Sequence, residues 1–348
     1  MILSCSPKLN KASLIKNILY PAAPDTARIQ YLTSFSSSLD ISKKQTAFEK
    51  TVVGVKKALP IYKPYGVFMR NGKIYVFDIA LGGALEILDF AKSEFTYFIP
   101  KGTFKLNKPI NGFVDANNML YIADLGLHKI AVINAEGKYV NSFGKEENKK
   151  PSSITIQGNK IFVADLGKNR INVYDKATYK FEYYFPQSNS GDKDYLYLPA
   201  NITALNDKIY VSDMGSGDVK IFTLEGKYLQ TIGQYGKNIG DFVRPKGIAV
   251  DKEENIYVVD ASFENVQIFN KEGQLLMFFG GPYIDKGDMW LPTSININYE
   301  DVKYFKKYVN PNYDLKYLII VANQYGPDKI SVYGRVELKV KTFVPKKK

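Results

Sequence analysis

Six prolines recur along the 348-residue chain at nearly constant spacing. The intervals between them are 45, 42, 48, 46 and 47 residues, and the prolines are Pro64, Pro109, Pro151, Pro199, Pro245 and Pro292. After most of them comes an apolar run that ends in Asp, as in residues 74–78, 120–124, 161–165, 209–213 and 256–260. A repeat of this length built from short strands is typical of a β-propeller or a similar array.

The fifth repeat shows how one unit is built. Its apolar runs predict four strands, at residues 244–251, 256–260, 266–269 and 274–280. Turn-forming residues separate them at 252–255, 261–265 and 271–273. Six such units predict an all-β, six-bladed propeller of four-stranded antiparallel blades. We expect one domain over residues 27–348, preceded by a tether over residues 1–26.

The repeat resembles the units of the NHL family, which read roughly proline-glycine-apolar, then tyrosine-valine-alanine-aspartate, then asparagine-arginine-isoleucine. Asp165 followed by residues 169–174, NRINVY, fits this pattern closely. The first unit departs from it at residues 81–84, and the sixth has Asn323 in place of Asp. The resemblance implies a propeller fold that hosts binders of protein, RNA or small ligands and a few enzymes.

The last unit has a poor fourth strand, which predicts how the ring closes. Residues 28–35 match the fourth strand at 227–232, so we expect them to form the outer strand of the last blade. Residues 336–342 are the alternative for that place. The sixth unit also contains an insertion at residues 299–314. Val302, Phe305 and Val309 have helical spacing there, which predicts a short amphipathic helix that packs on the ring.

The net charge of +12 and a pI near 9.3 indicate attraction to anionic partners, namely membrane surface, acidic polysaccharide, nucleic acid or acidic protein. The alternative is an ordinary Lys-rich surface, since 47 basic residues are scattered among 35 acidic ones. One cysteine excludes an intramolecular disulfide and a Cys-based metal site, and one histidine, His128, argues against zinc. No cofactor is expected.

The N-terminus contains the only cysteine, Cys5. Residues 2–5, ILSC, resemble the end of a bacterial lipoprotein signal peptide, without the usual charged and long apolar segments before it. We therefore expect Cys5 to be lipidated, residues 6–26 with Pro21 and Pro24 to form the tether, and the protein to be an extracytoplasmic lipoprotein at the periplasm or cell surface. If Met1 is the true start, the protein is cytoplasmic.

Basic residues precede four of the six repeat prolines, at Lys63, Lys108, Lys150 and Arg244. All four should stand where an innermost strand begins, near the mouth of the central channel, where converging cations would attract an anion. The alternative is that these side chains point sideways or into water. Arg170 and Trp290 complete the predicted ligand-binding set on the same loop face. The recurring Asp residues are expected to be structural, because a residue present in five units serves each unit.

The predicted function is a non-catalytic, membrane-tethered propeller, expected to be a monomer, that binds on its loop face. Its partner would be an exported or surface protein, an anionic small ligand or a glycan. The alternatives come from the resemblance. One is a calcium-dependent hydrolase such as a lactonase, for which Lys and Leu stand where carboxylates are needed. The other is an RNA-binding NHL propeller, which fits the charge but not an exported location, so nucleic acid is not the expected partner.

Overall fold

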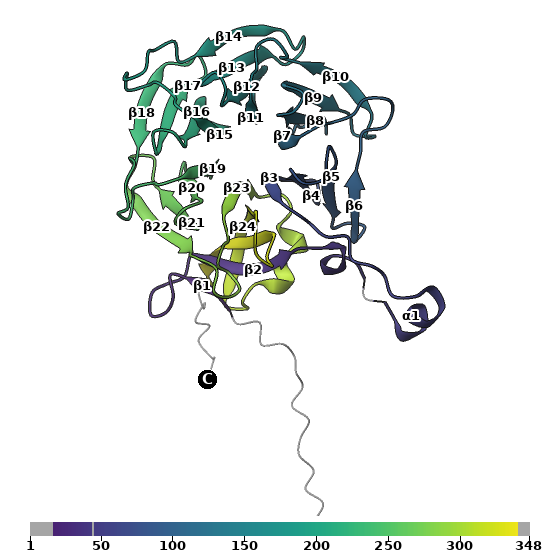
Figure 1. Ribbon diagram of the computed structural model, residues 1–348. Coiled ribbons are helices and arrows are strands. Elements are labelled where there is room, and N and C mark those ends of the chain that lie inside the picture. Colours follow the sequence, from purple (N-terminus) through teal and green to yellow (C-terminus); the bar gives the residue numbers. More distant parts are fainter. Residues whose placement is uncertain (1–16, 44, 340–348) are drawn as a thin grey trace, which may run out of the picture.

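Six β-sheets surround a central channel in the computed structural model, which describes residues 17–43 and 45–339 (Figure 1). Five sheets have four antiparallel strands in chain order from the channel outward, and the sixth has five strands. This arrangement confirms the predicted six-bladed propeller. Each repeat proline opens an innermost strand, and Asp ends the second strand of the first five blades.

The first three blades follow the repeat without interruption. Blade 1 comprises β3 (Pro64–Arg70), β4 (Lys73–Asp78), β5 (Leu85–Asp89) and β6 (Glu94–Phe98). Blade 2 comprises β7 (Pro109–Val114), β8 (Leu120–Asp124), β9 (Lys129–Ile133) and β10 (Tyr139–Phe143). Blade 3 comprises β11 (Pro151–Gln157), β12 (Lys160–Asp165), β13 (Arg170–Asp175) and β14 (Phe181–Phe185).

The remaining blades complete the circle. Blade 4 comprises β15 (Pro199–Leu205), β16 (Lys208–Asp213), β17 (Asp218–Thr223) and β18 (Tyr228–Ile232). Blade 5 comprises β19 (Pro245–Val250), β20 (Ile256–Asp260), β21 (Asn265–Phe269) and β22 (Leu275–Gly280). Blade 6 comprises β23 (Pro292–Asn298), β24 (Tyr313–Asn323), β25 (Ile330–Leu338), β2 (Ile29–Phe35) and β1 (Leu19–Tyr20).

The N-terminal part of the chain closes the ring. β2 pairs antiparallel with β25, from Ile29 opposite Arg335 to Phe35 opposite Ile330, which confirms the predicted closing strand at residues 28–35. Residues 336–338, part of the alternative closing segment, instead lengthen β25. The short outer strand β1 was not predicted, and it lies within the segment expected to be a tether.

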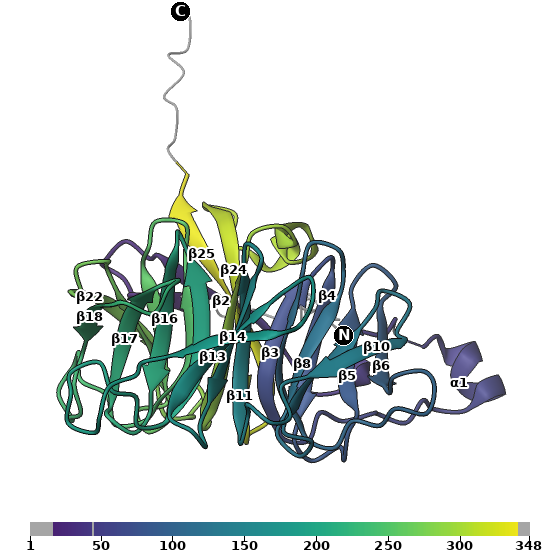
Figure 2. The ribbon, with the colours of Figure 1, turned by 90° about the horizontal axis from the view of Figure 1, so that it is seen from above.

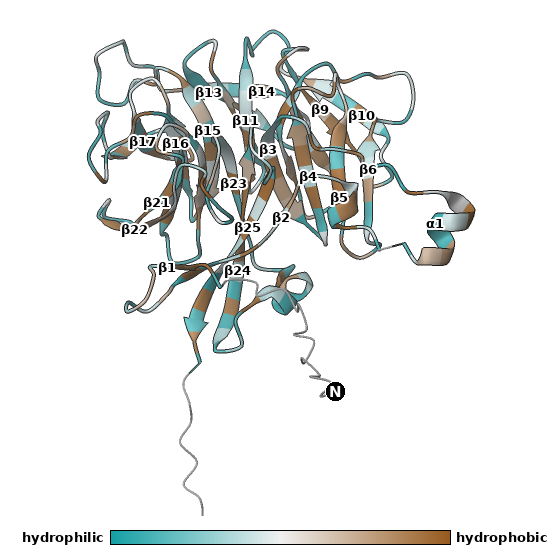
Figure 3. Cartoon of the chain, turned by 60° about the horizontal axis from the view of Figure 1, so that its bottom comes forward, coloured by the Kyte–Doolittle hydropathy of each residue, from teal (hydrophilic) through white to brown (hydrophobic). Residues whose placement is uncertain are grey.

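The core lies between blades, because both faces of each sheet pack against a neighbour. All five residues of β8 are buried, for example, so its sequence is almost uniformly apolar rather than alternating. Figure 3 shows this apolar character in brown on strands of blades 1 and 2, such as β4, β5 and β9. Tyr121, Phe162, Tyr210 and Tyr257 fill the gaps between neighbouring sheets with rings that are at most 2% exposed.

The predicted helical insertion of blade 6 is present as two 3₁₀ helices, η2 (Val302–Tyr304) and η3 (Lys306–Tyr308), rather than as an α-helix. Their hydrogen bonds span three residues, as from Tyr308 N to Phe305 O, which is usual for so short a segment. Phe305 is fully buried in a core cluster shared by blades 1 and 6. The insertion therefore packs on the ring, as expected.

A second helical segment was not predicted. The connection from β2 to β3 contains the 3₁₀ helix η1 (Ser38–Asp40) and the seven-residue helix α1 (Ala47–Val53), which projects from the ring (Figures 1 and 2). Thr46 and Glu49 form a capping box at the start of α1. In the described part of the chain, no helix is both long and apolar enough to cross a membrane.

The repeated Asp holds each blade to the connection that enters it. Asp165 is fully buried, and its carboxylate accepts hydrogen bonds from Lys149 N at 2.7 Å, Lys150 N at 2.8 Å and Gly167 N at 2.8 Å. The same pattern recurs at Asp78, Asp124, Asp213 and Asp260. These bonds satisfy backbone donors that no strand can reach, which confirms the structural role expected for these residues.

In blade 6, different residues hold the connection before the repeat proline. Asn323 stands at the Asp position, and its Nδ2 donates to Asp328 O at 2.7 Å. The Asn323 Oδ1 accepts no hydrogen bond, so the backbone N–H before the repeat proline has another partner. Leu291 N donates instead to the Glu264 carboxylate of blade 5 at 2.8 Å.

Substitution of Asp165 by Ala is expected to destabilise the protein by about 2–4 kcal/mol, because three backbone donors lose their acceptor in a buried place. Chemical denaturation monitored by circular dichroism measures the change. The control is E182Q, which removes an exposed carboxylate of the same blade and should change stability by less than about 0.5 kcal/mol. Equal stability of D165A and the wild type would contradict the role assigned to the repeated Asp.

Candidate functional site

Three cations meet where the innermost strands of blades 1 and 5 begin. Lys63 and Arg244 precede the prolines of these strands, and Lys246 follows the proline of β19. Burial, followed by the charges of Arg244 and Lys63, lowers the pKa of Lys246 from 10.5 to about 8. The Lys246 Nζ also lies 5.2 Å from the centre of the Tyr65 ring. We call Lys63, Arg244 and Lys246 the basic mouth.

Lys246 is the unusual member of the basic mouth. It is only 8% exposed, and no described Asp or Glu oxygen lies within 4.0 Å of its Nζ. By contrast, Lys220, the other buried lysine of residues 17–43 and 45–339, is paired with Asp218 at 2.7 Å. Burial of an unpaired cation is costly, and a nearby anion relieves that cost.

Lys108 and Lys150 occupy the equivalent positions in blades 2 and 3. Their backbone N–H groups bind Asp124 and Asp165, as the repeat requires, and both residues are exposed. Their charges are not among the causes of the lowered Lys246 pKa. The structure therefore brings together two of the four predicted basic residues, Lys63 and Arg244.

Arg170 lies on blade 3 against its outermost strand. Its guanidinium carbon stacks 4.0 Å from the centre of the Tyr184 ring, and its Nη2 donates to Glu147 O at 3.3 Å. These contacts fix Arg170 to β14 and to the connection before β11. The structure thus places Arg170 away from the innermost strands and from the basic mouth.

Trp290 belongs to an aromatic surface beside the basic mouth. It is 48% exposed and stacks on Tyr283, with 6.2 Å between ring centres and 25° between ring planes. Its carbonyl accepts a hydrogen bond from Tyr325 N, and Lys63 Nζ lies 5.1 Å above the Tyr325 ring. We call Tyr283, Trp290 and Tyr325 the aromatic rim. Exposed aromatic rings next to cations suit the binding of a partner.

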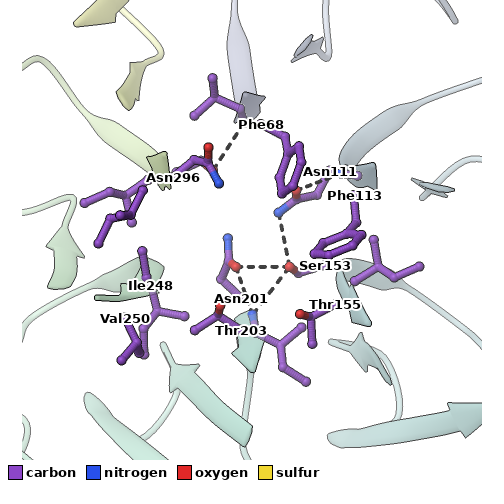
Figure 4. A pocket seen from close by; sticks show the side chains of 18 residues that line it. Phe68, Asn111, Phe113, Ser153, Thr155, Asn201, Thr203, Ile248, Val250 and Asn296 are labelled. Atoms are coloured by element: carbon purple, nitrogen blue, oxygen red, sulfur yellow. Dashed lines mark hydrogen bonds between the residues drawn. The ribbon is translucent and has the colours of Figure 1, made fainter. Parts of the chain in front are cut away.

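The channel behind the basic mouth is polar but uncharged (Figure 4). Asn111 Nδ2 donates to Ser153 Oγ at 3.2 Å, and Ser153 Oγ donates to Asn201 Oδ1 at 3.0 Å, which links blades 2, 3 and 4. Asn296 Oδ1 accepts from Met69 N at 3.0 Å and links blade 6 to blade 1. The cavity between them has a volume of about 90 Å³, and none of the described residues that line it is ionisable.

Candidate metal ligands are spread through the molecule rather than clustered. Over residues 17–43 and 45–339, no three His, Cys, Asp or Glu side chains gather closely enough to hold a metal ion. His128 lies in the turn between β8 and β9, where its Nδ1 is 2.5 Å from Lys149 O. Cys5 lies outside the described residues.

Sequence reasoning missed Lys246, although the repeat contained a signal. The residue after the repeat proline is uncharged in the other five units, where it is Tyr65, Ile110, Ser152, Ala200 or Thr293. A lysine at a position that the repeat keeps uncharged, in a strand buried on both faces, is expected to serve this blade alone. The prediction considered only the residue before each proline.

Comparisons with known proteins agree on the fold. A family described as a 6-bladed beta-propeller matches residues 191–342. No curated protein matches the sequence. Among solved structures, a structural genomics protein of unknown function from Bacteroides thetaiotaomicron is similar with a TM-score of 0.62 and 14% identity, over 88% of this chain and 76% of that chain. The virginiamycin B lyase from Staphylococcus aureus is similar with a TM-score of 0.55 and 16% identity, over 78% and 80% of the two chains. At these identities the likeness shows the fold alone.

Replacement of Lys246 by Met is expected to stabilise the protein at neutral pH. The Lys246 ammonium keeps its proton up to about pH 10.5 in the unfolded chain but only up to about pH 8 in the folded protein. The wild type therefore gains stability as the pH rises between these two values. Below pH 8 the full cost of burying the charged Lys246 ammonium, about 3 kcal/mol, lowers the stability of the wild type but not that of K246M. Urea denaturation at pH 7 and pH 10.5 measures the difference, which should nearly vanish at the higher pH.

The matched control is K180M, because Lys180 is an exposed lysine of blade 3. Its stability relative to the wild type should be independent of pH over the same range. A destabilised K246M at pH 7 would contradict the assignment of Lys246 as a buried, unpaired cation.

Proposed function

We propose that this protein is a non-catalytic binding protein whose basic mouth holds an anionic group of a ligand or of a partner protein. The observation that carries the proposal is the 8% exposed, unpaired Lys246, which is close enough to Lys63 and Arg244 for their charges to act on it. A bound carboxylate, phosphate or sulfate would neutralise this cluster and form charge-assisted hydrogen bonds with it. The fold does not need such a cluster, because five blades are built without a lysine at this position.

The aromatic rim supports a ligand that is larger than a simple ion. Trp290 and Tyr325 are 48% and 44% exposed, and both lie on the same side of the channel mouth as Lys63. Aromatic side chains of this kind contact apolar side chains or the faces of sugar rings. The rim and the basic mouth together favour an acidic segment of an exported or surface protein, an anionic small ligand or an acidic glycan.

The axis of the propeller also favours binding over the calcium-dependent alternative. A calcium ion at the axis needs several oxygen ligands with carboxylates among them. The side chains of Asn111, Ser153, Asn201 and Asn296 supply amides and hydroxyls, most of which already bind one another or the backbone.

Membrane tethering through Cys5 is part of the proposal. It rests on residues 2–5, which resemble the end of a bacterial lipoprotein signal peptide. A lipid anchor together with a basic surface would hold the propeller near anionic lipid. We therefore propose an extracytoplasmic location.

Anion binding is tested by isothermal titration of inorganic pyrophosphate at low salt and pH 8.5. A bound anion raises the pKa of Lys246, so binding should take up protons, and the measured heat should depend on the ionisation enthalpy of the buffer. The double variant K63E/R244E should bind at least tenfold more weakly. The control R28E/K180E makes the same change in net charge at exposed positions and should bind as the wild type does.

Two outcomes would contradict anion binding at the basic mouth. One is equal affinity of K63E/R244E and its control for pyrophosphate. The other is the absence of measurable binding to the wild type at low salt. If the first outcome takes the form of equal weakening by both double variants, it shows a diffuse effect of net charge rather than a specific site.

Tethering is tested by metabolic labelling of a bacterial host that expresses the gene from its genomic start site. Radioactive palmitate should enter the wild-type protein and leave C5A unlabelled, because acylation requires the thiol of Cys5. The wild type should sediment with membranes and C5A should not. Equal labelling of both proteins would contradict the role of Cys5.

A further inference from the structure

The end of the channel opposite the basic mouth contains a larger cavity, with a volume of about 360 Å³. It lies where the innermost strands end, between Arg70 of β3, Gln157 of β11, Thr203 of β15 and Asn298 of β23. Its size is within the range of pockets that bind small molecules. Because Lys63 and Arg70 are separated by an extended strand, the two ends of the channel are about 20 Å apart.

This end is where blade 6 departs from the repeat. The turn between the first two strands of blade 1 consists of Asn71 and Gly72, whereas in blade 6 the same connection runs over residues 299–312. Tyr299 and Glu300, from the beginning of this insertion, line the cavity. β24 and β25 also extend beyond the other blades on this side (Figure 2). A departure confined to one unit indicates a purpose that the ring itself does not require.

Tyr299 is held in place by a lysine of the neighbouring blade. Lys252 N donates to Tyr299 Oη at 2.9 Å, and Lys252 Nζ lies 4.4 Å from the centre of the Tyr299 ring. Lys252 lines the cavity as well. The wall of the cavity is thus shared by the insertion and by the turn that follows β19.

Arg70 is the residue of this cavity whose hydrogen-bonding needs are unmet. Its Nε is buried and has no hydrogen-bond partner. No described acidic oxygen lies within 4.0 Å of its guanidinium. The planar donors of a guanidinium match the two oxygens of a carboxylate, which is its preferred partner in proteins.

Two phenylalanines form the inner part of the cavity. The rings of Phe68 and Phe113 lie 5.0 Å apart at 48° and project into the channel (Figure 4). Both residues line this cavity and the smaller one in the channel. Phe68 stands two residues before Arg70 in β3, so the two rings offer an apolar surface close to Arg70.

We propose that this cavity binds a small carboxylate that carries an aromatic or other planar apolar group. The carboxylate pairs with the Arg70 guanidinium, and the apolar group lies against Phe68 and Phe113. The Lys252 ammonium adds a second positive charge at the rim, partly offset by Glu300. This site is separate from the basic mouth, and its assignment does not depend on anion binding there.

The probe for this site is 4-fluorophenylacetate, observed by fluorine NMR with the full chain. Its resonance should broaden and shift on addition of wild-type protein. The neutral analogue 4-fluorobenzyl alcohol lacks the carboxylate and should bind at least tenfold more weakly than the probe. Acetate lacks the ring, and its affinity, measured by competition with the probe, should also be at least tenfold lower. The variant R70Q should lose at least tenfold in affinity for 4-fluorophenylacetate.

Matched variants separate this site from the rest of the molecule. R28Q removes the same charge at an exposed position and should bind the probe as the wild type does. K63E/R244E, which alters the basic mouth, should also leave the affinity unchanged. T203F fills the cavity from blade 4 while keeping the Arg70 guanidinium, and it should abolish binding, so the test does not rest on R70Q alone. Thermal unfolding of each variant confirms that it is folded.

Three results would overturn the proposal. The first is unchanged affinity of folded R70Q or folded T203F. The second is equal affinity of the wild type for the carboxylate and the alcohol. The third is loss of probe binding in K63E/R244E, which would place the ligand at the other end of the channel.

Discussion

The interaction on which the rest of the structure depends is a buried carboxylate at the end of the second strand. It accepts hydrogen bonds from the two backbone N–H groups that precede the repeat proline and from the turn that follows its own strand. Proline can then open the innermost strand, because the chain before it is already fixed. The positions of Lys63 and Arg244 follow from these bonds, since each has its own N–H on such a carboxylate. The same interaction therefore builds the ring and sets the positions of the cations around its channel.

The channel shows how a repeated fold acquires individual features. Its middle is lined by amides and hydroxyls that join neighbouring blades, so it carries no net charge. Its ends differ, with Lys246 and its neighbours at one end and Arg70 with an aromatic wall at the other. In both places a cation lacks an acidic partner in the described chain. Groups of this kind reduce stability, so they are the positions where selection for binding is most visible.

The fold was predictable from the sequence because the repeat states the same pattern several times. The spacing from Pro64 to Pro292 predicted the number of blades, and the match of residues 28–35 to residues 227–232 predicted how the ring closes. α1 and β1 were missed because each occurs once, in segments without periodicity. The 3₁₀ geometry of residues 302–308 was also missed, since the spacing of Val302, Phe305 and Val309 fits either kind of helix.

The candidate site was predictable only in part, for a physical reason. Position in the repeat predicts where a backbone lies but not how a long side chain is packed, so Lys108, Lys150 and Arg170 were grouped with Lys63 and Arg244. Lys246 and Arg70 became visible only when burial was known. Both stand in innermost strands, where neighbouring blades keep most of the Lys246 side chain and the Nε of Arg70 away from the counterions that water would supply.

The pairing of β2 with β25 has a consequence for biosynthesis. β2 is synthesised before the six repeats, but its partner β25 leaves the ribosome about 300 residues later, together with the last sheet. During this interval the completed blades form a growing open arc, and β2 has no neighbour in blade 6. Because a nascent arc exposes unpaired strand edges, elongation is the period when chaperones have most to shield.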